Sequence, residues 1–330
     1  MSTSRDLLGE VVNAVGRRPA PPREDYEYVL ESAMAAWRRK VRSRRRRRWA
    51  LAIAASAAIA AVGGATLLRW LPPRGLMPVV AVTAVIRADV TIRAPRERDW
   101  HPLQPSAEVA AGSRLRTGAR AGLALRLDDG TSVRLDSRSE LELQSATTMR
   151  LLSGTLYVDS GPADHSSAHL RIETSTGTAT DVGTIFEVRA EPGRLRVRVR
   201  EGRVQVDASH SATHIESVAG EELELNDSGV PRHRRFAPTD PAWAWAEALS
   251  SPGDVENRPL LPFLAWVARE TGRKLQFQGP EVEAHAREVV LHGKTRDLTP
   301  LQALDLMLST TDLEYMLSAD EAIVIRRRFE

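Results

Sequence analysis

Two pairs of histidines are the first candidates for chemistry in this chain of 330 residues. His165 and His169 lie in the segment HSSAH, and His210 and His214 lie in HSATH. On a helix, this i, i+4 spacing could hold a metal ion between two imidazoles. Both segments are serine-rich and lie between predicted strands. We therefore expect solvated loops and no metal site, and these four histidines are the only metal candidates.

No other residue pattern in the sequence predicts catalysis. The chain has no cysteine, which excludes a thiolate zinc site, a cysteine nucleophile and a disulfide framework. Motifs of a Ser-His-Asp triad or of paired catalytic carboxylates are also missing. The composition, 42% hydrophobic and 27% charged, is that of an ordinary globular protein. We therefore expect a protein that is not an enzyme and needs no cofactor.

An uncharged segment of twenty residues, 49–68, predicts a membrane-spanning helix over residues 49–71. At about 1.5 Å per residue it crosses a hydrocarbon core of roughly 30 Å. Nine of the eleven residues Arg38–Arg48 are Arg or Lys, which places residues 1–48 in the cytoplasm. A buried soluble helix, a cleaved signal peptide and a nucleic-acid-binding arginine run are the alternatives. The length and the adjacent charge favour the membrane span, so we expect the bilayer as a partner and no nucleic acid.

The cytoplasmic segment contains one amphipathic pattern, over residues 24–41. Its apolar stripe includes Tyr28, Met34 and Trp37, and its acidic residues precede its basic ones, as the helix dipole favours. A segment this short cannot bury a core of its own. The stripe is therefore expected to bind a partner helix or to lie on the membrane surface.

After a linker at 72–80, residues 81–232 predict an all-β domain, because apolar residues alternate with polar ones between Gly, Asp and Ser turns. Asp128-Asp129-Gly130 and Glu201-Gly202 are expected hairpin turns. The expected strands cover 123–127, 133–135, 141–143, 149–152, 155–158, 170–173, 185–188, 195–199 and 204–206. Such a pattern is typical of a sandwich, roll or stacked solenoid.

The C-terminal part predicts a small α+β domain at 258–330, after a linker at 233–257 with a short helix near 240–249. Its expected order is αββαββ: a helix that ends before Gly272, strands at 274–277 and 287–291, a helix opened by Thr299-Pro300, and a closing hairpin. The whole chain is therefore expected to be mainly β, with one transmembrane helix and a small α+β module.

Three segments of the β domain, which contain four sequence blocks in order, resemble the extracytoplasmic domain of the FecR family of sigma-factor regulators. The resemblance rests on LDDGTSVRLDSRSELEL, MRLLSGTLYVDSG, and TATDVGTIFEVRAEPGRLRVRVREGRVQV, at 127–143, 149–161 and 178–206. The C-terminal module is similar to that of FecR proteins, which itself resembles the short N-terminal signalling modules of secretins and TonB-dependent receptors. Such modules pair through sheet edges and helix faces.

The resemblance also draws attention to Gly183-Thr184, inside VGTIFEV. In some members of the family the matching Gly-Thr is a self-cleavage site. A threonine hydroxyl would attack the preceding carbonyl and form an ester that water opens. The alternative is structural: Gly183 permits a tight bend and Thr184 suits the start of a strand.

The alternating arginines of one strand, Arg194, Arg196, Arg198 and Arg200, predict a solvated face that discourages edge aggregation. The other interpretation is contact with an acidic partner or an anionic envelope polymer.

The resemblance implies a single-pass inner-membrane signal transducer with periplasmic C-terminal domains. It implies two partners, an extracytoplasmic-function sigma factor inside and a TonB-dependent receptor or other envelope protein outside. The cytoplasmic part is shorter than is usual in the family. The alternative function is an anchored periplasmic scaffold of the cell envelope that binds no sigma factor.

Overall fold

The computed structural model describes residues 78–161, 169–209, 214–228, 230–250, 252, 255–295 and 298–328. The predicted membrane span and the apolar stripe of Tyr28, Met34 and Trp37 lie outside these residues. Within the described residues, every helix is too short or too polar to cross a membrane.

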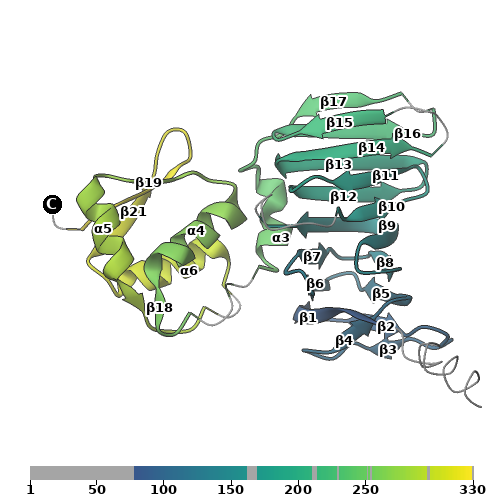
Figure 1. Cartoon of the computed structure of the whole chain (residues 1–330), viewed down its shortest axis with the longest axis horizontal. Helices are drawn as coiled ribbons and strands as arrows, with labels where there is room; N and C mark the ends of the chain where they lie inside the picture. Colours follow the sequence, from purple (N-terminus) through teal and green to yellow (C-terminus); the bar gives the residue numbers. More distant parts are fainter. Residues whose placement is uncertain are drawn as a thin grey trace, which may run out of the picture. The chain divides into compact units, whose positions relative to one another are not determined.

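Strands alone build the first half of the described chain, as the alternating pattern predicts (Figure 1). Its nine earlier strands are β1 (Val79–Arg87), β2 (Val90–Arg93), β3 (His101–Pro102), β4 (Glu108–Ala110), β5 (Ser113–Thr117), β6 (Gly122–Leu127), β7 (Ser132–Leu135), β8 (Glu140–Leu143) and β9 (Thr148–Asp159). The later strands are β10 (Arg171–Glu173), β11 (Gly177–Asp181), β12 (Ile185–Glu191), β13 (Arg194–Glu201), β14 (Arg203–Ala208), β15 (His214–Val218), β16 (Glu221–Asn226) and β17 (Arg232–Arg235).

These strands form two layers that share β9. The first layer runs in the order β4-β1-β6-β7-β9-β12-β13-β16-β17. The second runs in the order β3-β2-β5-β8-β9-β10-β11-β14-β15, and only its β9–β10 pair is parallel. Apolar side chains from both layers, such as Leu115, Leu123, Val197 and Val206, form one buried core. The two layers therefore make a sandwich.

Gly154 is the point at which β9 passes from one layer to the other. Residues before it pair with β8 and β10, and residues after it pair with β7 and β12. Gly154 has φ +92°, and a Cβ there would lie 2.6 Å from the Cα of Ser139. The sequence predicts two separate strands here, at 149–152 and 155–158. The structure corrects this to one long strand, because glycine allows the chain to change layer without a break in pairing.

Of the two predicted hairpins, the one between β6 and β7 is confirmed. The other is wrong, because β13 and β14 do not pair with each other. β6 pairs with β7 across the Asp128–Gly130 turn, where Gly130 has φ +89°. β13 and β14 are joined at Gly202, which has φ +77°. After this turn the two strands belong to different layers, since β13 pairs with β12 and β16 while β14 pairs with β11 and β15.

The linker and the C-terminal module contain all of the described helices. The linker holds a 3-10 turn, η1 (Pro241–Trp243), and α3 (Ala244–Glu247). The module consists of β18 (Arg258–Pro259), α4 (Leu260–Thr271), β19 (Leu275–Phe277), α5 (Pro280–Glu288), β20 (Val290–Leu291), α6 (Pro300–Ser309), β21 (Leu313–Leu317) and β22 (Ile323–Arg327). α4 and α6 share a core with the three-stranded sheet β19-β22-β21.

The module differs from the expected αββαββ order at residues 280–288. This segment is helix α5, and the predicted strand 287–291 shrinks to β20 at 290–291. Pro280 occupies the first helical turn, acidic Glu281 and Glu283 follow it, and Arg287 lies in the last turn. Proline and acidic residues favour the first turn of a helix, and a basic residue favours its last turn. At the other helix the prediction is confirmed, because Thr299 caps α6 in a capping box with Gln302.

Candidate functional site

Gly183 and Thr184 lie in the connection between β11 and β12, which belong to different layers of the sandwich. Gly183 has φ +68°, a left-handed conformation that few other residues adopt. Gly202 lies directly against this bend: a Cβ on it would be 2.5 Å from the carbonyl oxygen of Gly183. Two glycines therefore allow two loops to meet closely at the Gly183-Thr184 peptide bond.

Thr184 is buried and fully engaged in hydrogen bonds. Its hydroxyl donates a short hydrogen bond to the Asp181 carboxylate. Its backbone N–H donates to the Ser160 hydroxyl at 2.9 Å, and that hydroxyl donates to the Thr184 carbonyl oxygen at 3.0 Å. Asp181 and Thr184 are each 1% exposed. The three side chains thus fix the position of Thr184 and shield it from water.

Burial raises the pKa of Asp181 above its ordinary value, although hydrogen bonds from Thr184 and Ser160 oppose the rise. A smaller lowering of the Asp181 pKa comes from the imidazole of His169. A carboxylate with a raised pKa that accepts a hydrogen bond from a threonine hydroxyl is suited to act as a general base. Asp181 and Ser160 were not predicted as site residues. Asp181 lies three positions before Thr184, so its proximity was a usable local signal, whereas Ser160 is 24 positions away and left none.

The other predicted site residues are not brought together. His165 and His210 lie outside the described residues, and His214 opens β15 in contact with Asp207. No group of three possible metal-ligating side chains occurs in the described parts of the chain.

The alternating arginines do not form a solvated face, which corrects the sequence-based expectation. Arg194 is exposed, but Arg198 and Arg200 are 9% and 4% exposed. Arg198 binds Glu222 at 2.6 Å and lies 4.0 Å from the centre of the Phe236 ring. The expected acidic partner is therefore intramolecular, on the neighbouring strand.

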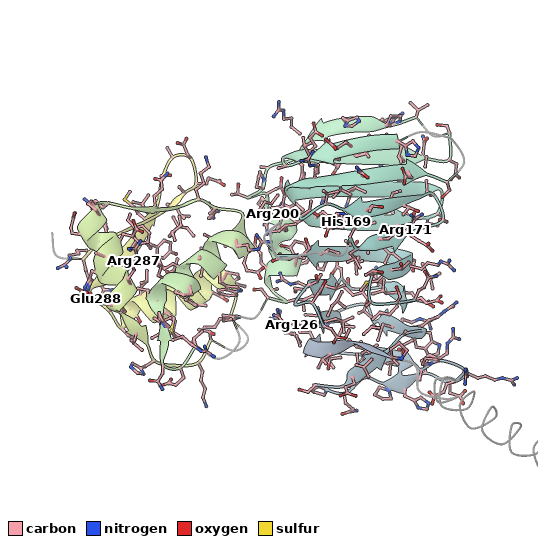
Figure 2. The ribbon with its side chains drawn as sticks, in the orientation of Figure 1. Arg126, His169, Arg171, Arg200, Arg287 and Glu288 are labelled. Carbon is pink, nitrogen blue, oxygen red and sulfur yellow. The ribbon has the colours of Figure 1, made fainter. Side chains whose placement is uncertain are left out.

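Arg200 holds the linker against the first layer (Figure 2). Its guanidinium donates to the Pro238 carbonyl at 2.7 Å, to the Glu270 carbonyl at 2.6 Å and to the Glu247 carboxylate at 2.7 Å. It also lies 4.6 Å from the centre of the Trp243 ring, which packs on Tyr157. One side chain thus binds the linker, α3 and the end of α4.

Two further arginine–carboxylate pairs join the strands to α4. Arg134 of β7 binds both oxygens of Glu270, at 2.5 and 2.7 Å, and both side chains are buried. Burial by itself would lower the pKa of Arg134, but the carboxylate of Glu270 raises it overall. Arg269 reaches back to Asp159 and Glu201. Sequence reasoning missed these residues because partners 68 or more positions apart leave no local signal.

The comparison with protein families agrees with the sequence motifs. Residues 113–205 match the model of the family described as FecR protein. Two crystal structures of a Parabacteroides distasonis protein that bears the provisional name of an anti-sigma factor, at 1.65 and 2.50 Å resolution, are similar. Each is 18% identical, with a TM-score of 0.35, and covers 65% of this chain and 98% of its own. No curated protein matches.

Proposed function

We propose that this chain, whose residues 113–205 match the FecR family model, is a sigma-factor regulator in the form of a single-pass transducer of the inner membrane. Its β sandwich and C-terminal module would lie in the periplasm and receive a signal from a TonB-dependent receptor or another envelope protein. Its residues 1–48 would hold or release an extracytoplasmic-function sigma factor. The observation that carries the proposal is the family match over residues 113–205.

The contacts between the sandwich and α4 support a role in transmission. A single membrane helix transmits little by itself, so a signal must first alter the domain attached to it. Arg134, Arg200 and Arg269 tie the sandwich to the module through buried or half-buried charged contacts. A partner that docks on the module can therefore act on the sandwich through these contacts, because changing one of them leaves a charge without its partner.

The proposed topology can be tested with cysteine labelling, since the chain has no cysteine of its own. Ser32→Cys lies in the proposed cytoplasmic segment, and Ala146→Cys lies on an exposed turn of the sandwich. A membrane-impermeant maleimide applied to spheroplasts should label Ala146→Cys alone, and label both variants after lysis. Labelling of Ser32→Cys in intact spheroplasts would overturn the topology.

Sigma-factor binding can be tested by co-purification of the tagged full chain from its native membranes, followed by mass spectrometry. We expect a sigma factor with the wild-type chain and its loss with the double variant Met34→Ala/Trp37→Ala. Ser32→Ala, on the same predicted helix, is the matched control and should retain the sigma factor. No sigma factor in any sample, together with unchanged transcription when the protein is deleted, would support the alternative envelope scaffold.

A second activity, self-cleavage between Gly183 and Thr184, is favoured by the hydrogen bond from the Thr184 hydroxyl to Asp181. In this proposal Asp181 takes the hydroxyl proton while the oxygen attacks the Gly183 carbonyl carbon. The C–N bond then breaks, and the proton passes to the freed amine of Thr184. Water hydrolyses the resulting ester, which leaves a carboxylate on Gly183 and restores the hydroxyl of Thr184.

The position of this bond predicts that the two pieces would stay together after cleavage. β11, before the bond, pairs with β10 and β14, while β12, after it, pairs with β9 and β13. Each piece therefore contributes strands to both layers of one core. Cleavage would remove one covalent link without exposing the apolar interior.

Self-cleavage is tested on denaturing gels and by intact-mass analysis of the purified full chain. We expect fragments 1–183 and 184–330, which co-elute on native gel filtration. Thr184→Ala should stay intact, Thr184→Ser should cleave, and Asp181→Asn should cleave about 100-fold or more slowly. Thr180→Ala, on the adjacent strand, is the control and should cleave normally. An intact wild-type chain after prolonged incubation would exclude the activity.

A further inference from the structure

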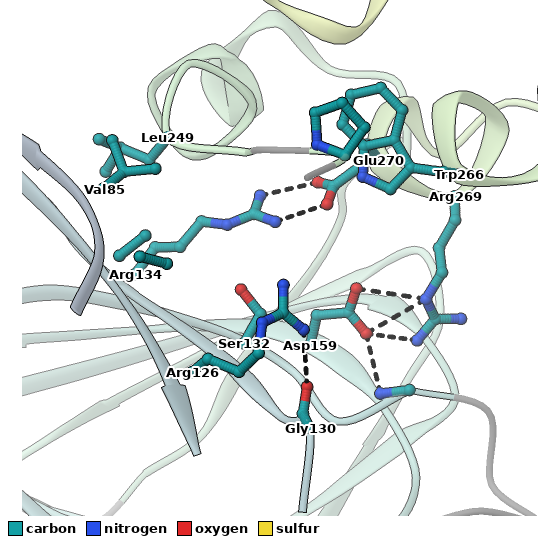
Figure 3. Close-up of a pocket in the computed structure, with 14 residues that line it drawn as sticks. Val85, Arg126, Gly130, Ser132, Arg134, Asp159, Leu249, Trp266, Arg269 and Glu270 are labelled. Atoms are coloured by element: carbon teal, nitrogen blue, oxygen red, sulfur yellow. Dashed lines mark hydrogen bonds and ion pairs between the residues drawn. The ribbon is translucent and has the colours of Figure 1, made fainter. Parts of the chain in front are cut away.

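A cavity of about 260 Å³ lies between the first layer of the sandwich and α4 (Figure 3). One part of its wall is apolar and includes Val85, Leu249 and Trp266. The other part is charged. Its charged residues are Arg126, Arg134, Arg269, Asp159 and Glu270. A small cavity with an apolar wall and convergent polar groups has the general composition of a ligand site.

The charges of this wall do not balance. Glu270 binds Arg134, and Asp159 binds Arg269, so both carboxylates are already paired. The guanidinium of Arg126 donates one hydrogen bond, to the carbonyl of Gly130 at 3.2 Å, and has no ion-pair partner among the described residues. Arg269 is also bound by Glu201, so the unpaired positive charge of the wall is that of the exposed Arg126 side chain. Its remaining N–H donors are available to a ligand.

The guanidinium of Arg134 is already used inside the protein. Arg134 lines the cavity, but the residue is 2% exposed and its Nε is covered by protein atoms. Its terminal nitrogens donate to the Glu270 carboxylate and the Ala246 carbonyl. A ligand carboxylate would therefore meet the donors of Arg126.

We propose that this cavity binds a small organic monocarboxylate with an apolar or aromatic body. The carboxylate would be bound by Arg126, and the body would lie against Val85, Leu249 and Trp266. A single negative charge balances the unpaired charge of Arg126. A dianion is disfavoured because Asp159 and Glu270 lie in the same wall, and a cation is repelled by Arg126. The inference is independent of sigma-factor regulation and of cleavage at Gly183-Thr184.

The test uses isothermal titration of the full-length protein in detergent, with benzoate as the probe. We expect saturable binding of one benzoate per chain, and at least about tenfold weaker binding of benzamide, which keeps the ring and lacks the charge. Acetate, which lacks the body, and phthalate, which carries two charges, should also bind at least tenfold more weakly. Equal affinity for benzoate and benzamide, or no saturable binding of benzoate, would overturn the proposal.

Two variants locate the site. Arg126→Gln should weaken benzoate binding at least tenfold, while Arg120→Gln, at a second exposed arginine of the sandwich, should leave it unchanged. Ala84→Trp adds a large side chain at an exposed position of the cavity wall and should abolish binding without disturbing the core. Each variant is first checked for an unchanged melting temperature. Wild-type affinity in both Arg126→Gln and Ala84→Trp would place any binding elsewhere and refute the assignment.

Discussion

Arg134 and Glu270 are 136 positions apart in the chain, yet they form a bidentate ion pair in which both side chains are at most 5% exposed. The same guanidinium donates to the carbonyl of Ala246 at 2.9 Å and lies 4.9 Å from the centre of the Tyr157 ring. One pair thus joins β7, the linker and α4. Because its partners come from three segments, the pair depends on how the sandwich and the module pack against each other.

Glu270→Gln should destabilise the protein by about 3–5 kcal/mol, since it leaves the buried Arg134 charge without a counter-charge. Urea unfolding of the full chain in detergent, followed by tryptophan fluorescence, measures the change. The double variant Arg134→Met/Glu270→Leu should recover most of the loss, because an apolar pair removes both charges together. A double variant as unstable as Glu270→Gln would show that packing, and not the charge, is decisive.

Arg200→Met should release the linker from the first layer. It removes the donors to Pro238, Glu247 and Glu270 and leaves two carbonyls unsatisfied, at a cost of about 3 kcal/mol. Limited proteolysis should then cut within residues 236–250 at a protease concentration that leaves the wild type intact. Arg194→Met is the matched control on the same strand, and its exposed position predicts little change. Equal protection of both variants would contradict the role given to Arg200.

Gly154→Ala should destabilise the sandwich by at least about 2 kcal/mol, because it combines a left-handed φ with overlap against Ser139. Gly130→Ala separates the two effects. Gly130 has φ +89° but nothing within 4 Å of its added Cβ, so only the conformational cost of about 1 kcal/mol is expected. Similar melting temperatures for the two variants would show that the contact with Ser139 is unimportant.

The raised pKa of Asp181 predicts how self-cleavage depends on pH. Only the ionised carboxylate accepts the Thr184 proton, so the rate should rise with pH and level off, with a midpoint above 3.8. Asp181→Asn should abolish this rise. The free energy of unfolding should have the opposite trend. The folded protein binds the Asp181 proton more tightly than the unfolded chain does, so stability falls as pH rises from the unfolded pKa of this carboxyl group to its folded pKa. A cleavage rate that is independent of pH in the wild type would exclude Asp181 as the base.

Local signals in the sequence predicted much of the fold. Alternating apolar residues and Asp-Gly or Glu-Gly turns predicted the β6–β7 hairpin and the turn at Gly202, because strand formation and turn conformation depend on neighbouring residues. The expected pairing of β13 with β14 was wrong, since the two strands lie in different layers. Thr299-Pro300 likewise predicted the start of α6. The FecR match within residues 113–205 could be anticipated from the same motifs.

The errors have local and non-local causes. Helix α5 was missed although Gly279-Pro280-Glu281 is a local start signal, and the strand expected at 287–291 included its last two residues. The expected solvated arginine face was wrong for another reason. Alternation places Arg198 and Arg200 on one face of β13, but it does not reveal that Phe236 and Trp243 cover that face.

The features of the candidate sites also have either local or non-local origins. The sequence by itself determined the alternating strands, the turns and the Gly183-Thr184 dipeptide, since each depends on residues close together in the chain. Asp181 lies three positions before Thr184, so that contact is local as well. Only the tertiary structure placed Ser160 beside Thr184, and Arg134 against Glu270. These contacts depend on which strands become neighbours in the two layers. That arrangement is set by the burial of the whole apolar core, so no short segment of the sequence contains it.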